Sequence, residues 1–302
     1  MQDLSLIITK HPNKEAEDYY KNLIGIEYQK DSLLSTLSVI LDKDKINRWK
    51  KKHHQNSLNI INQLNARTPL VILSGEVGCG KSALAQTIAT PLSKILGRSI
   101  ITFTTPSNIR GSGLVGELSN RITETFLIIK GKLVNENLGI VIIDEADDLA
   151  TSRAQNQAHH EDRAGLNVLV KQIDILQNEK NNLAVILITN RLNVLDPAIR
   201  RRAMLTLKFG RPTNGKLKEV FEYIFKGSSY DEKEITDLVE IASNKKIAYS
   251  YSDLIQRVGF RTLFKSIDND KPFSIKAYKE ALINTEPSPL IEETTITNMN
   301  SG

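Results

Sequence analysis

The stretch "LVILSGEVGCGKSALAQ", residues 70–86, places a glycine-rich loop between a run of aliphatic residues and a segment that favours a helix. Its spacing from Gly75 to Ser82 is G-x-x-x-x-G-K-S, the pattern of a phosphate-binding loop. Glycines leave the main-chain N–H groups free to wrap a polyphosphate, which larger side chains would block. The positive end of the following helix and the charge of Lys81 add to the attraction for the β- and γ-phosphates. We therefore predict a nucleotide site that contains Gly75, Glu76, Val77, Gly78, Cys79, Gly80, Lys81, Ser82 and Ala83.

Two acidic residues follow a second aliphatic run, in "GIVIIDEADD" at residues 139–148. A carboxylate at the carboxyl end of a strand beside a phosphate loop can hold Mg²⁺ through water, so Asp144 is predicted to bind Mg²⁺ together with the Ser82 hydroxyl. The next residue, Glu145, can polarise the attacking water as a general base. A solvated acidic turn is the alternative interpretation. The loop and the carboxylates together predict hydrolysis of the nucleotide as well as binding.

The next two polar segments along the chain carry further candidates. "AVILITN" ends at Asn190, whose neutral amide can orient the attacking water without disturbing the charge of the carboxylates. "VLDPAIRRRA" places Arg200, Arg201 and Arg202 at the end of a short helix. They can form a solvent-facing cluster or pair with acidic residues of the same chain. They can also supply an arginine finger to the γ-phosphate of a neighbouring subunit, which accelerates hydrolysis by about 10³–10⁵.

Composition and length are those of an ordinary globular protein with a large core, since 302 residues are 40% hydrophobic and 25% charged. No apolar run reaches the length of a membrane span, and the first residues lack the basic and apolar regions of a signal peptide. The single cysteine, Cys79, excludes an internal disulfide and fits a reducing compartment. We expect a cytoplasmic protein without a membrane partner.

The net charge is +5, and part of it comes from "KDKINRWKKKHH" at residues 43–54. Such a segment can contact nucleic acid, but a solvated helix face or loop is the simpler interpretation. The sequence contains no helix-turn-helix, no zinc motif and no interleaving of aromatic and basic residues typical of single-strand binders. Nucleic acid therefore stays an alternative partner that the sequence does not favour.

Five aliphatic runs predict buried strands, because continuous hydrophobicity is typical of a sheet covered on both faces; they are residues 70–73, 100–103, 140–143, 184–188 and 204–207. Helical periodicity between them predicts an α/β fold with a parallel five-stranded sheet between helices. After "FGRPTNG" only helical patterns remain. We expect a short lead at 1–20, a large α/β domain at 21–212, a small all-helical domain at 213–284 and a disordered tail at 285–302.

The chain resembles the AAA+ ATPases from about Leu23 to Leu282, through "GEVGCGKS", "IVIIDEAD", "ILITNR" and "LDPAIRRRA" in that order. This resemblance implies that the α/β domain is a P-loop NTPase and that the helical domain is its lid. It also implies that ATP and Mg²⁺ are the ligands and that the chain assembles as a homo-hexamer.

The same resemblance assigns residues around the phosphate loop. It makes Arg201 and Arg202 better arginine-finger candidates than Arg200. In "AYSYSDLIQRV", Ser252 stands where many AAA+ proteins carry a sensor arginine in the lid. "NLIGIEYQKDSLL" resembles the segment that covers the adenine, which places near the base the residues Ile24, Gly25 and Ile26.

A substrate pore is also implied by the resemblance. "RGSGLVGELSNRI" is similar to the pore loop that grips substrate, with Leu114 in place of the usual aromatic residue, followed by Val115 and Gly116. A leucine can wedge against an extended peptide, or it can simply pack against its neighbour. His159 and His160 fall where a second pore loop would lie, and adjacent histidines without Cys or His partners are poor metal ligands. We interpret both histidines as polar residues that face the pore.

Within the AAA+ proteins, "HHEDRAGLNVLVKQID" and "DPAIRRRAMLTLKFGRP" most resemble the pachytene checkpoint-type ATPases that remodel HORMA-domain proteins, in the short bacterial form of CBASS antiphage operons. The implied function is an ATP-driven ring that pulls an extended peptide of such a partner through its pore. A nucleic-acid or helicase loader is the alternative. A salt-sensitive gel shift would favour the loader, and stimulation of hydrolysis by a protein's disordered terminus would favour the remodeller.

Overall fold

The structure, a computed structural model, describes residues 6–54, 56, 58–65, 67–106, 116–133, 137–149, 160–178 and 182–291. The chain divides into two compact units. The first contains Met1–Gly75 and Gly80–Phe209, and the second contains Glu76–Cys79 and Gly210–Gly302. The phosphate loop therefore belongs partly to each unit, and the two units are described separately.

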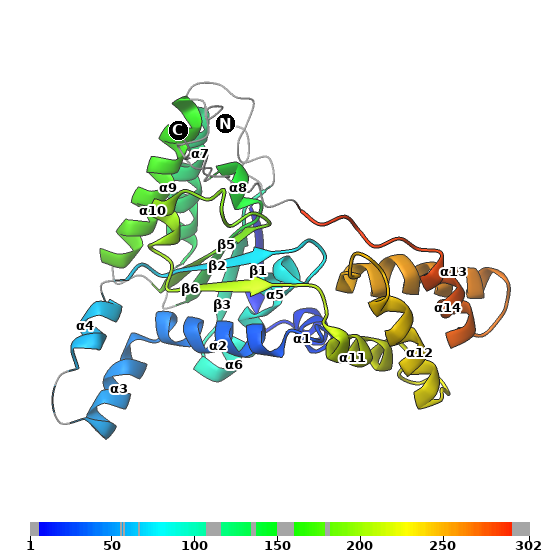
Figure 1. The fold of residues 1–302 in the computed structure, drawn as a ribbon. Coiled ribbons are helices and arrows are strands. Elements are labelled where there is room, and N and C mark those ends of the chain that lie inside the picture. Colours follow the sequence, from blue (N-terminus) through cyan, green and yellow to red (C-terminus); the bar gives the residue numbers. More distant parts are fainter. Residues whose placement is uncertain are drawn as a thin grey trace, which may run out of the picture. The chain divides into compact units, whose positions relative to one another are not determined.

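A six-stranded sheet forms the centre of the first unit (Figure 1), in the order β1-β3-β4-β5-β2-β6. The five predicted strands are parallel to one another, so the predicted α/β fold is confirmed. Continuous burial of the strands at 70–75, 138–143 and 183–189 explains why they read as aliphatic runs, whereas the strand at 205–209 has exposed and buried residues in alternation. The bounds of the strands are β1 Ile7–His11, β2 Leu70–Gly75, β3 Ile100–Thr104, β4 Leu138–Ile143, β5 Leu183–Thr189 and β6 Leu205–Phe209.

Strand β1 is the addition to the predicted sheet, and it lies in the segment that we expected to be a lead. It pairs antiparallel with β3, with His11 opposite Ile100. His11 is buried, and its ring nitrogens lie 2.7 Å from Thr90 Oγ1 and 3.2 Å from Thr102 Oγ1. Burial lowers the pKa of His11 to about 4, so the imidazole is neutral near pH 7. The sequence does not predict this edge strand because only one of its five residues is buried.

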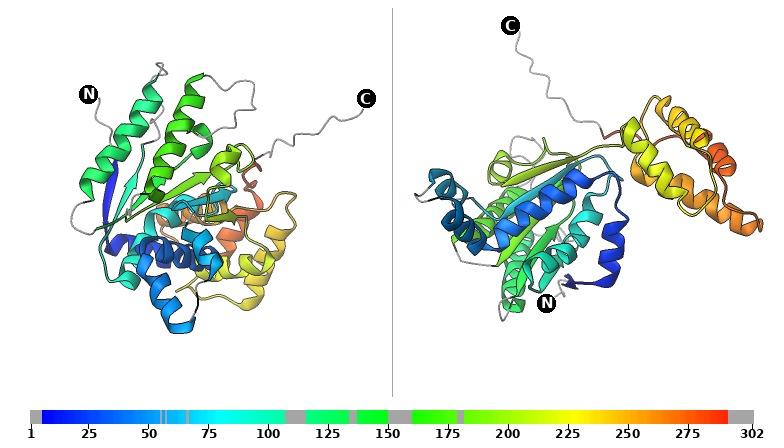
Figure 2. Two further views of the ribbon diagram at one scale, coloured as in Figure 1. Left: turned by 90° about the vertical axis from the view of Figure 1, so that its left-hand side faces the viewer. Right: turned by 90° about the horizontal axis from the view of Figure 1, so that it is seen from below.

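Helices cover both faces of the sheet, as the views of Figures 1 and 2 show. On one face, α7 (Glu117–Lys132) and α9 (His160–Asn178) lie side by side. The other face is covered by α2 (Glu27–Leu41), α5 (Lys81–Thr87) and α6 (Ala89–Leu96). This two-sided cover is what a parallel sheet requires, because neither of its faces can remain in water.

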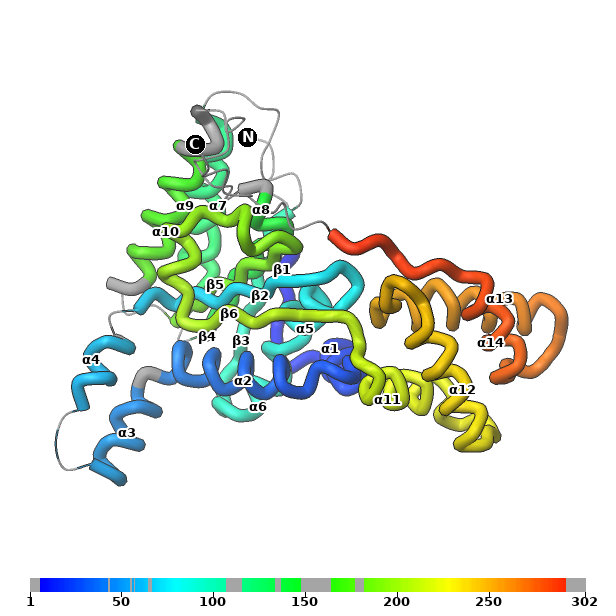
Figure 3. The backbone as a smooth tube through the Cα atoms, viewed as in Figure 1, coloured from blue at the N-terminus to red at the C-terminus, as the bar shows by residue number. Residues whose placement is uncertain are grey.

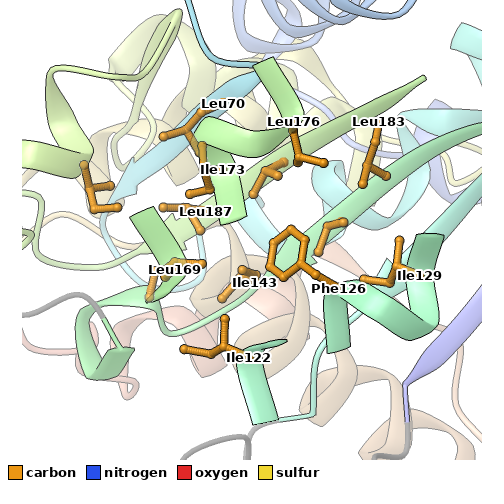
Figure 4. Close-up of a cluster of buried hydrophobic side chains, with 14 of the residues drawn as sticks. Leu70, Ile122, Phe126, Ile129, Ile143, Leu169, Ile173, Leu176, Leu183 and Leu187 are labelled. Atoms are coloured by element: carbon orange, nitrogen blue, oxygen red, sulfur yellow. The ribbon is translucent and has the colours of Figure 1, made fainter. Parts of the chain in front are cut away.

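The core between the sheet and helices α7 and α9 follows from hydrophobic periodicity. Leu166, Leu169, Ile173 and Leu176 recur along one side of α9, and all four are buried. Figure 4 shows three of them in one cluster with Phe126 of α7 and with strand residues. The helical periodicity in this part of the sequence therefore marks residues that belong to the core.

Five further helices complete the described part of the first unit: α1 (Lys14–Lys21), α3 (Lys43–His53), α4 (Asn59–Asn65), α8 (Ala146–Leu149) and α10 (Pro197–Arg200). Helix α3 begins after Asp42, whose carboxylate accepts a hydrogen bond from the Lys45 N–H and so caps the helix. Among the described residues, no helix is long and apolar enough to cross a membrane.

The second unit is helical, as predicted, and packs around an aromatic core. Its elements are α11 (Asn214–Ile224), α12 (Glu232–Ser243), a π-helix (Asp253–Phe260), α13 (Arg261–Asp268) and α14 (Ile275–Ile283). Tyr278 is fully buried and meets Phe221 and Phe225 edge-on, with ring centroids 6.0 Å and 5.3 Å away. Edge-to-face pairs of this kind stabilise a core beyond the area that they bury.

The tail that we expected to be disordered begins with seven described residues, 285–291, of which Thr285, Glu286, Ser288 and Pro289 make hydrogen bonds (the red segment after α14 in Figure 3). The Tyr249 hydroxyl donates to the Thr285 carbonyl at 2.6 Å, and the Ser288 N–H donates to Asp253 Oδ2 at 3.1 Å. The polar, proline-containing sequence hides this order, because its partners are buried polar groups elsewhere in the unit. Residues 292–302 lie outside the described part of the chain.

Candidate active site

The phosphate loop starts where β2 ends and finishes where α5 begins. Gly75 has φ 125°, and a Cβ built on it would lie 2.0 Å from the Phe209 carbonyl oxygen, so only glycine fits at this position. Gly80 has φ 92° and leads directly into the helix. The backbone therefore turns from strand to helix through conformations that side chains would hinder, and the N–H groups at the start of α5 stay accessible to an anion.

Lys81 lies inside this turn, with 6% of its surface exposed. Its Nζ donates a hydrogen bond to the Gly75 carbonyl at 2.8 Å, so the side chain folds back over the loop that precedes it. The positive charge is thus held next to the end of β2, where the loop begins. A polyphosphate bound there would meet this ammonium and the helix N-terminus together.

The two predicted Mg²⁺ ligands lie next to each other. Ser82, at the start of α5, donates from its hydroxyl to Asp144 Oδ2 at 2.6 Å, just beyond the end of β4. Among the described residues, no group of three His, Cys, Asp or Glu side chains could hold a metal by itself. One hydroxyl and one carboxylate suit Mg²⁺ when a nucleotide's phosphates and water supply the remaining oxygen ligands.

Glu145 has a strained backbone beside this pair. Its φ is 51°, a left-handed conformation that is uncommon for residues with a side chain and costs about 1–3 kcal/mol. Its N–H donates to Asp144 Oδ1 at 2.9 Å, and its side chain is exposed. The turn therefore fixes Asp144 through the main chain and leaves the Glu145 carboxylate free of the core.

The sequence did not predict a second hydrogen-bonded contact, which joins the segment after β4 to the end of β5. Asp147 is 8% exposed and accepts hydrogen bonds from Thr189 Oγ1 at 3.0 Å and from Arg191 Nε at 3.2 Å. The Arg191 N–H in turn donates to the Thr189 hydroxyl at 3.0 Å. Asn190 is half-buried between these two residues, so its backbone is held from both sides. The only sequence signal was the third acidic residue of "DEADD".

The three arginines after α10 are not equivalent. Arg202 donates to Asp174 of α9 from both Nε (2.7 Å) and Nη2 (2.9 Å), and it also donates to the Ala198 carbonyl. This fork raises the pKa of Arg202, because its hydrogen bonds with Asp174 favour the charged form. Arg200 and Arg201 are exposed. Pairing within the chain, one of the alternatives considered for this cluster, thus occurs at Arg202.

The segment predicted to cover the adenine lies beside the loop. Ile26 is 4% exposed, and its Cδ1 lies 3.3 Å from the position that a Gly80 Cβ would take. Gly25 has φ 74°, and its N–H donates to the Glu27 carboxylate at 3.0 Å. Ile24 is half-buried. The structure therefore brings this segment and the C-terminal part of the phosphate loop together.

The tip of the loop, Glu76–Cys79, belongs to the second unit together with Ser252. The Ser252 N–H donates to the Gly78 carbonyl at 3.0 Å, and its hydroxyl donates to Gln256 at 2.8 Å. Ser252 therefore contacts the loop through its main chain rather than through a long charged side chain.

Arg211, which the sequence analysis did not single out, joins three segments of the second unit. Its side chain is 6% exposed and donates to the Glu76 carboxylate, to the Ala248 carbonyl and to the carbonyls of Ser288 and Pro289. A planar guanidinium can serve so many acceptors at once because its five N–H groups point in fixed directions.

We expect Arg211→Ala to destabilise the second unit by about 3 kcal/mol, because the Glu76 carboxylate and three carbonyls lose a charged donor. Urea unfolding followed by circular dichroism, with hydrogen exchange over residues 248–291, measures the effect. Arg261→Ala, at an exposed arginine of the same unit, is the matched control. Equal stability of the two variants would contradict the role of Arg211.

The structure describes two of the five predicted pore residues, Gly116 and His160. Leu114, Val115 and His159 lie outside the described residues. Gly116 has φ 80° and is the residue before α7, and His160 is the first residue of α9. Their role in a pore stays a prediction.

Comparison with known families agrees with this geometry. Residues 71–211 match the family described as "ATPase family associated with various cellular activities (AAA)". The chain belongs to this family of AAA ATPases, and it is an ATPase.

Particular relatives share most of its length. CD-NTase-associated protein 6 of Escherichia coli strain KTE188 is 31% identical over 283 residues, which cover 93% of this chain and 95% of the relative. The protein of the same name from strain MS 115-1 is 33% identical over 258 residues, or 82% and 83% of the two chains. The sequence similarity therefore includes both units.

Solved structures give the same result. A chain in the structure of the E. coli MS115-1 HORMA:CdnC:Trip13 complex has a TM-score of 0.88 and 29% identity, and the match covers 95% of this chain and 98% of that one. The structure of Rhizobiales Trip13 has a TM-score of 0.74 and 25% identity, with 94% and 98% covered. The fold is thus that of a short Trip13-type ATPase.

Proposed function

We propose that this chain forms a cytoplasmic homo-hexameric ring that uses ATP to remodel a HORMA-domain protein in bacterial CBASS antiphage regulation. The observation that carries the proposal is the likeness, over nearly the full length of both chains, to a chain of the HORMA:CdnC:Trip13 complex. The similarity to CD-NTase-associated protein 6 supports the same cellular setting.

In the proposed chemistry, the main-chain N–H groups of the phosphate loop and the Lys81 ammonium bind the β- and γ-phosphates. The Ser82 hydroxyl and the Asp144 carboxylate, 2.6 Å apart, would hold Mg²⁺, which neutralises phosphate charge when it is bound. Glu145 accepts a proton from the attacking water, and the Asn190 amide orients that water. The ties of Asp144 and Asp147 to their neighbours keep these groups in place before ATP arrives.

In the proposed ring, the adjacent subunit supplies an arginine to the γ-phosphate. We assign that role to Arg201 in preference to Arg202, because Arg202 is already committed to Asp174 of its own chain. Arg201 is exposed, and among the described residues its hydrogen bonds involve its main chain alone: its N–H donates to the Pro197 carbonyl at 3.0 Å, and its carbonyl accepts from Arg67 Nη1 at 2.8 Å. Its guanidinium can therefore approach another molecule at no cost in lost ion pairs.

The proposed function is tested with a bacterial HORMA-domain protein. We expect that partner to stimulate ATP hydrolysis and to change conformation only when ATP is hydrolysed. The control is the same partner without its flexible terminal segment, which should neither stimulate nor be remodelled. Stimulation by nucleic acid alone, with no response to the HORMA protein, would instead indicate the loader.

Leu114→Ala is expected to abolish remodelling while the basal hydrolysis of ATP changes less than twofold, because the role proposed for Leu114 is to grip the substrate and not to contact the nucleotide. The measurement compares both activities in one preparation. Leu127→Ala, at an exposed leucine of α7, is the matched control and should leave both unchanged. Remodelling by Leu114→Ala at the wild-type rate would show that Leu114 does not grip substrate.

A further inference from the structure

Helix α3 and the next residue, His54, form a strongly basic segment. Residues 43–54 contain six lysines or arginines against one aspartate, a formal charge of +5, which equals the +5 of the complete chain. In the rest of the chain, the number of lysines and arginines therefore equals the number of aspartates and glutamates. A charge concentrated in so short a stretch produces a local positive field that an evenly mixed surface does not.

The segment lies at the periphery of the first unit, beyond the end of α2 (Figure 1). Lys45, Arg48, Lys51 and Lys52 are exposed. Two of these have partners within the chain: Lys45 Nζ donates to the hydroxyl of buried Ser38, and Arg48 pairs with Asp42. Lys51 and Lys52 are therefore the exposed cations most available to a ligand. The cations thus surround the helix as a solvent-accessible surface.

Trp49 stands in the middle of this surface with 47% of its area exposed. Its ring lies 4.7 Å from that of His54 and 6.0 Å from that of His53, centroid to centroid. Helical spacing places Lys45 and Lys52 on the same side of α3 as the indole. From the sequence, a solvated face is the simpler interpretation and nucleic-acid contact the alternative, because the sequence does not reveal that the aromatic ring is exposed among the lysines.

Helix stability alone does not explain this arrangement. Cations in the last turn complement the helix dipole, which accounts for Lys50, Lys51 and Lys52. The like-charged pair Arg48 and Lys52, four residues apart, works against the helix. An indole left half in water also forgoes the stabilisation that burial would give. The like-charged pair and the half-exposed indole both suit a surface that a bound ligand would cover and stabilise.

We infer that α3 binds single-stranded nucleic acid, with its lysines on the phosphates and Trp49 stacked on a base. Five of the six cations are lysines, which are depleted at protein–protein interfaces but suit the salt-dependent contacts that dominate nucleic-acid binding. An exposed ring among cations is the feature that lets single strands bind without sequence preference. This surface is separate from the ATPase site, and it is independent of the proposed HORMA partner.

The test uses the full chain and a fluorescently labelled 20-nucleotide oligo-dT. We expect binding that weakens with salt, together with quenching of Trp49 emission, which is specific because Trp49 is the only tryptophan. Lys50→Gln/Lys51→Gln/Lys52→Gln should lower the slope of log K against log salt by about 2, since each phosphate contact to a single strand contributes about 0.7. Trp49→Ala should weaken binding about tenfold or more with the slope unchanged, and Trp49→Phe should restore it.

The control removes the same charge from the other unit, by Lys265→Gln/Lys271→Gln/Lys276→Gln at three exposed lysines. This control should bind oligo-dT as the wild type does, and all variants should keep wild-type basal ATP hydrolysis. Polyglutamate should not quench Trp49. Preference for polyglutamate, equal binding of duplex DNA without quenching, or equal loss in the control variant would each overturn the inference.

Discussion

Glu145→Gln is expected to bind ATP as the wild type does and to hydrolyse it about 10²–10⁴ times more slowly. The substitution removes the group that accepts the proton of the attacking water. It keeps the main-chain bond from residue 145 to Asp144 and the contact of Ser82 with Asp144, so the phosphate site is preserved. The measurement is phosphate release at saturating ATP, together with ATP binding at equilibrium.

Lys81→Ala provides the complementary control. The ammonium is buried in the loop, so its loss should weaken ATP binding itself as well as lower the rate. Hydrolysis by Glu145→Gln within twofold of the wild type would remove Glu145 from its role. Unchanged ATP binding by Lys81→Ala would contradict the assignment of the phosphate loop.

Features that depend on local pattern could be read from the sequence. The buried strands appear as continuous aliphatic runs, and the glycine spacing identifies the loop between β2 and α5. The proximity of Ser82 and Asp144 also follows, because parallel strands in one sheet end at the same edge. These predictions need no knowledge of distant contacts.

Features that depend on contacts between residues far apart in the sequence could not be predicted from local pattern. The sequence presents Arg200, Arg201 and Arg202 as equals, and only the fold brings Asp174 of α9 against the third of them. Strand β1 was missed for a related reason, since its one buried residue, His11, is polar and is satisfied by threonines at least 79 residues away. The same holds for Arg211, whose acceptors lie in three separate segments.

The pairing of Arg202 leads to the second large expected effect. Arg201→Ala should bind ATP normally and hydrolyse it about 10³-fold more slowly, because a trans arginine stabilises the charge that develops on the transferred phosphoryl group. The main-chain bond between residue 201 and Arg67 does not involve the substituted side chain. Arg200→Ala is the matched control at an equally exposed neighbour and should stay near the wild-type rate.

Arg202→Ala separates a structural role from a catalytic one. If Arg202 acts only through its fork with Asp174, then Asp174→Asn should lower the stability and the hydrolysis rate to a similar extent, because either change breaks the same pair. If Arg202→Ala lowers the rate of ATP hydrolysis more than Asp174→Asn does, at equal stability, Arg202 would be the arginine finger after all.

Mixing experiments then test whether Arg201 acts across a subunit boundary. Neither Arg201→Ala nor Glu145→Gln should hydrolyse ATP appreciably alone. In a mixed ring, some interfaces pair an intact Glu145 with an intact Arg201 of the neighbour, so part of the activity should return. Wild-type hydrolysis should also rise faster than linearly with protein concentration while rings assemble. Full activity of Arg201→Ala, or activity strictly proportional to concentration down to clearly monomeric protein, would exclude an arginine supplied in trans.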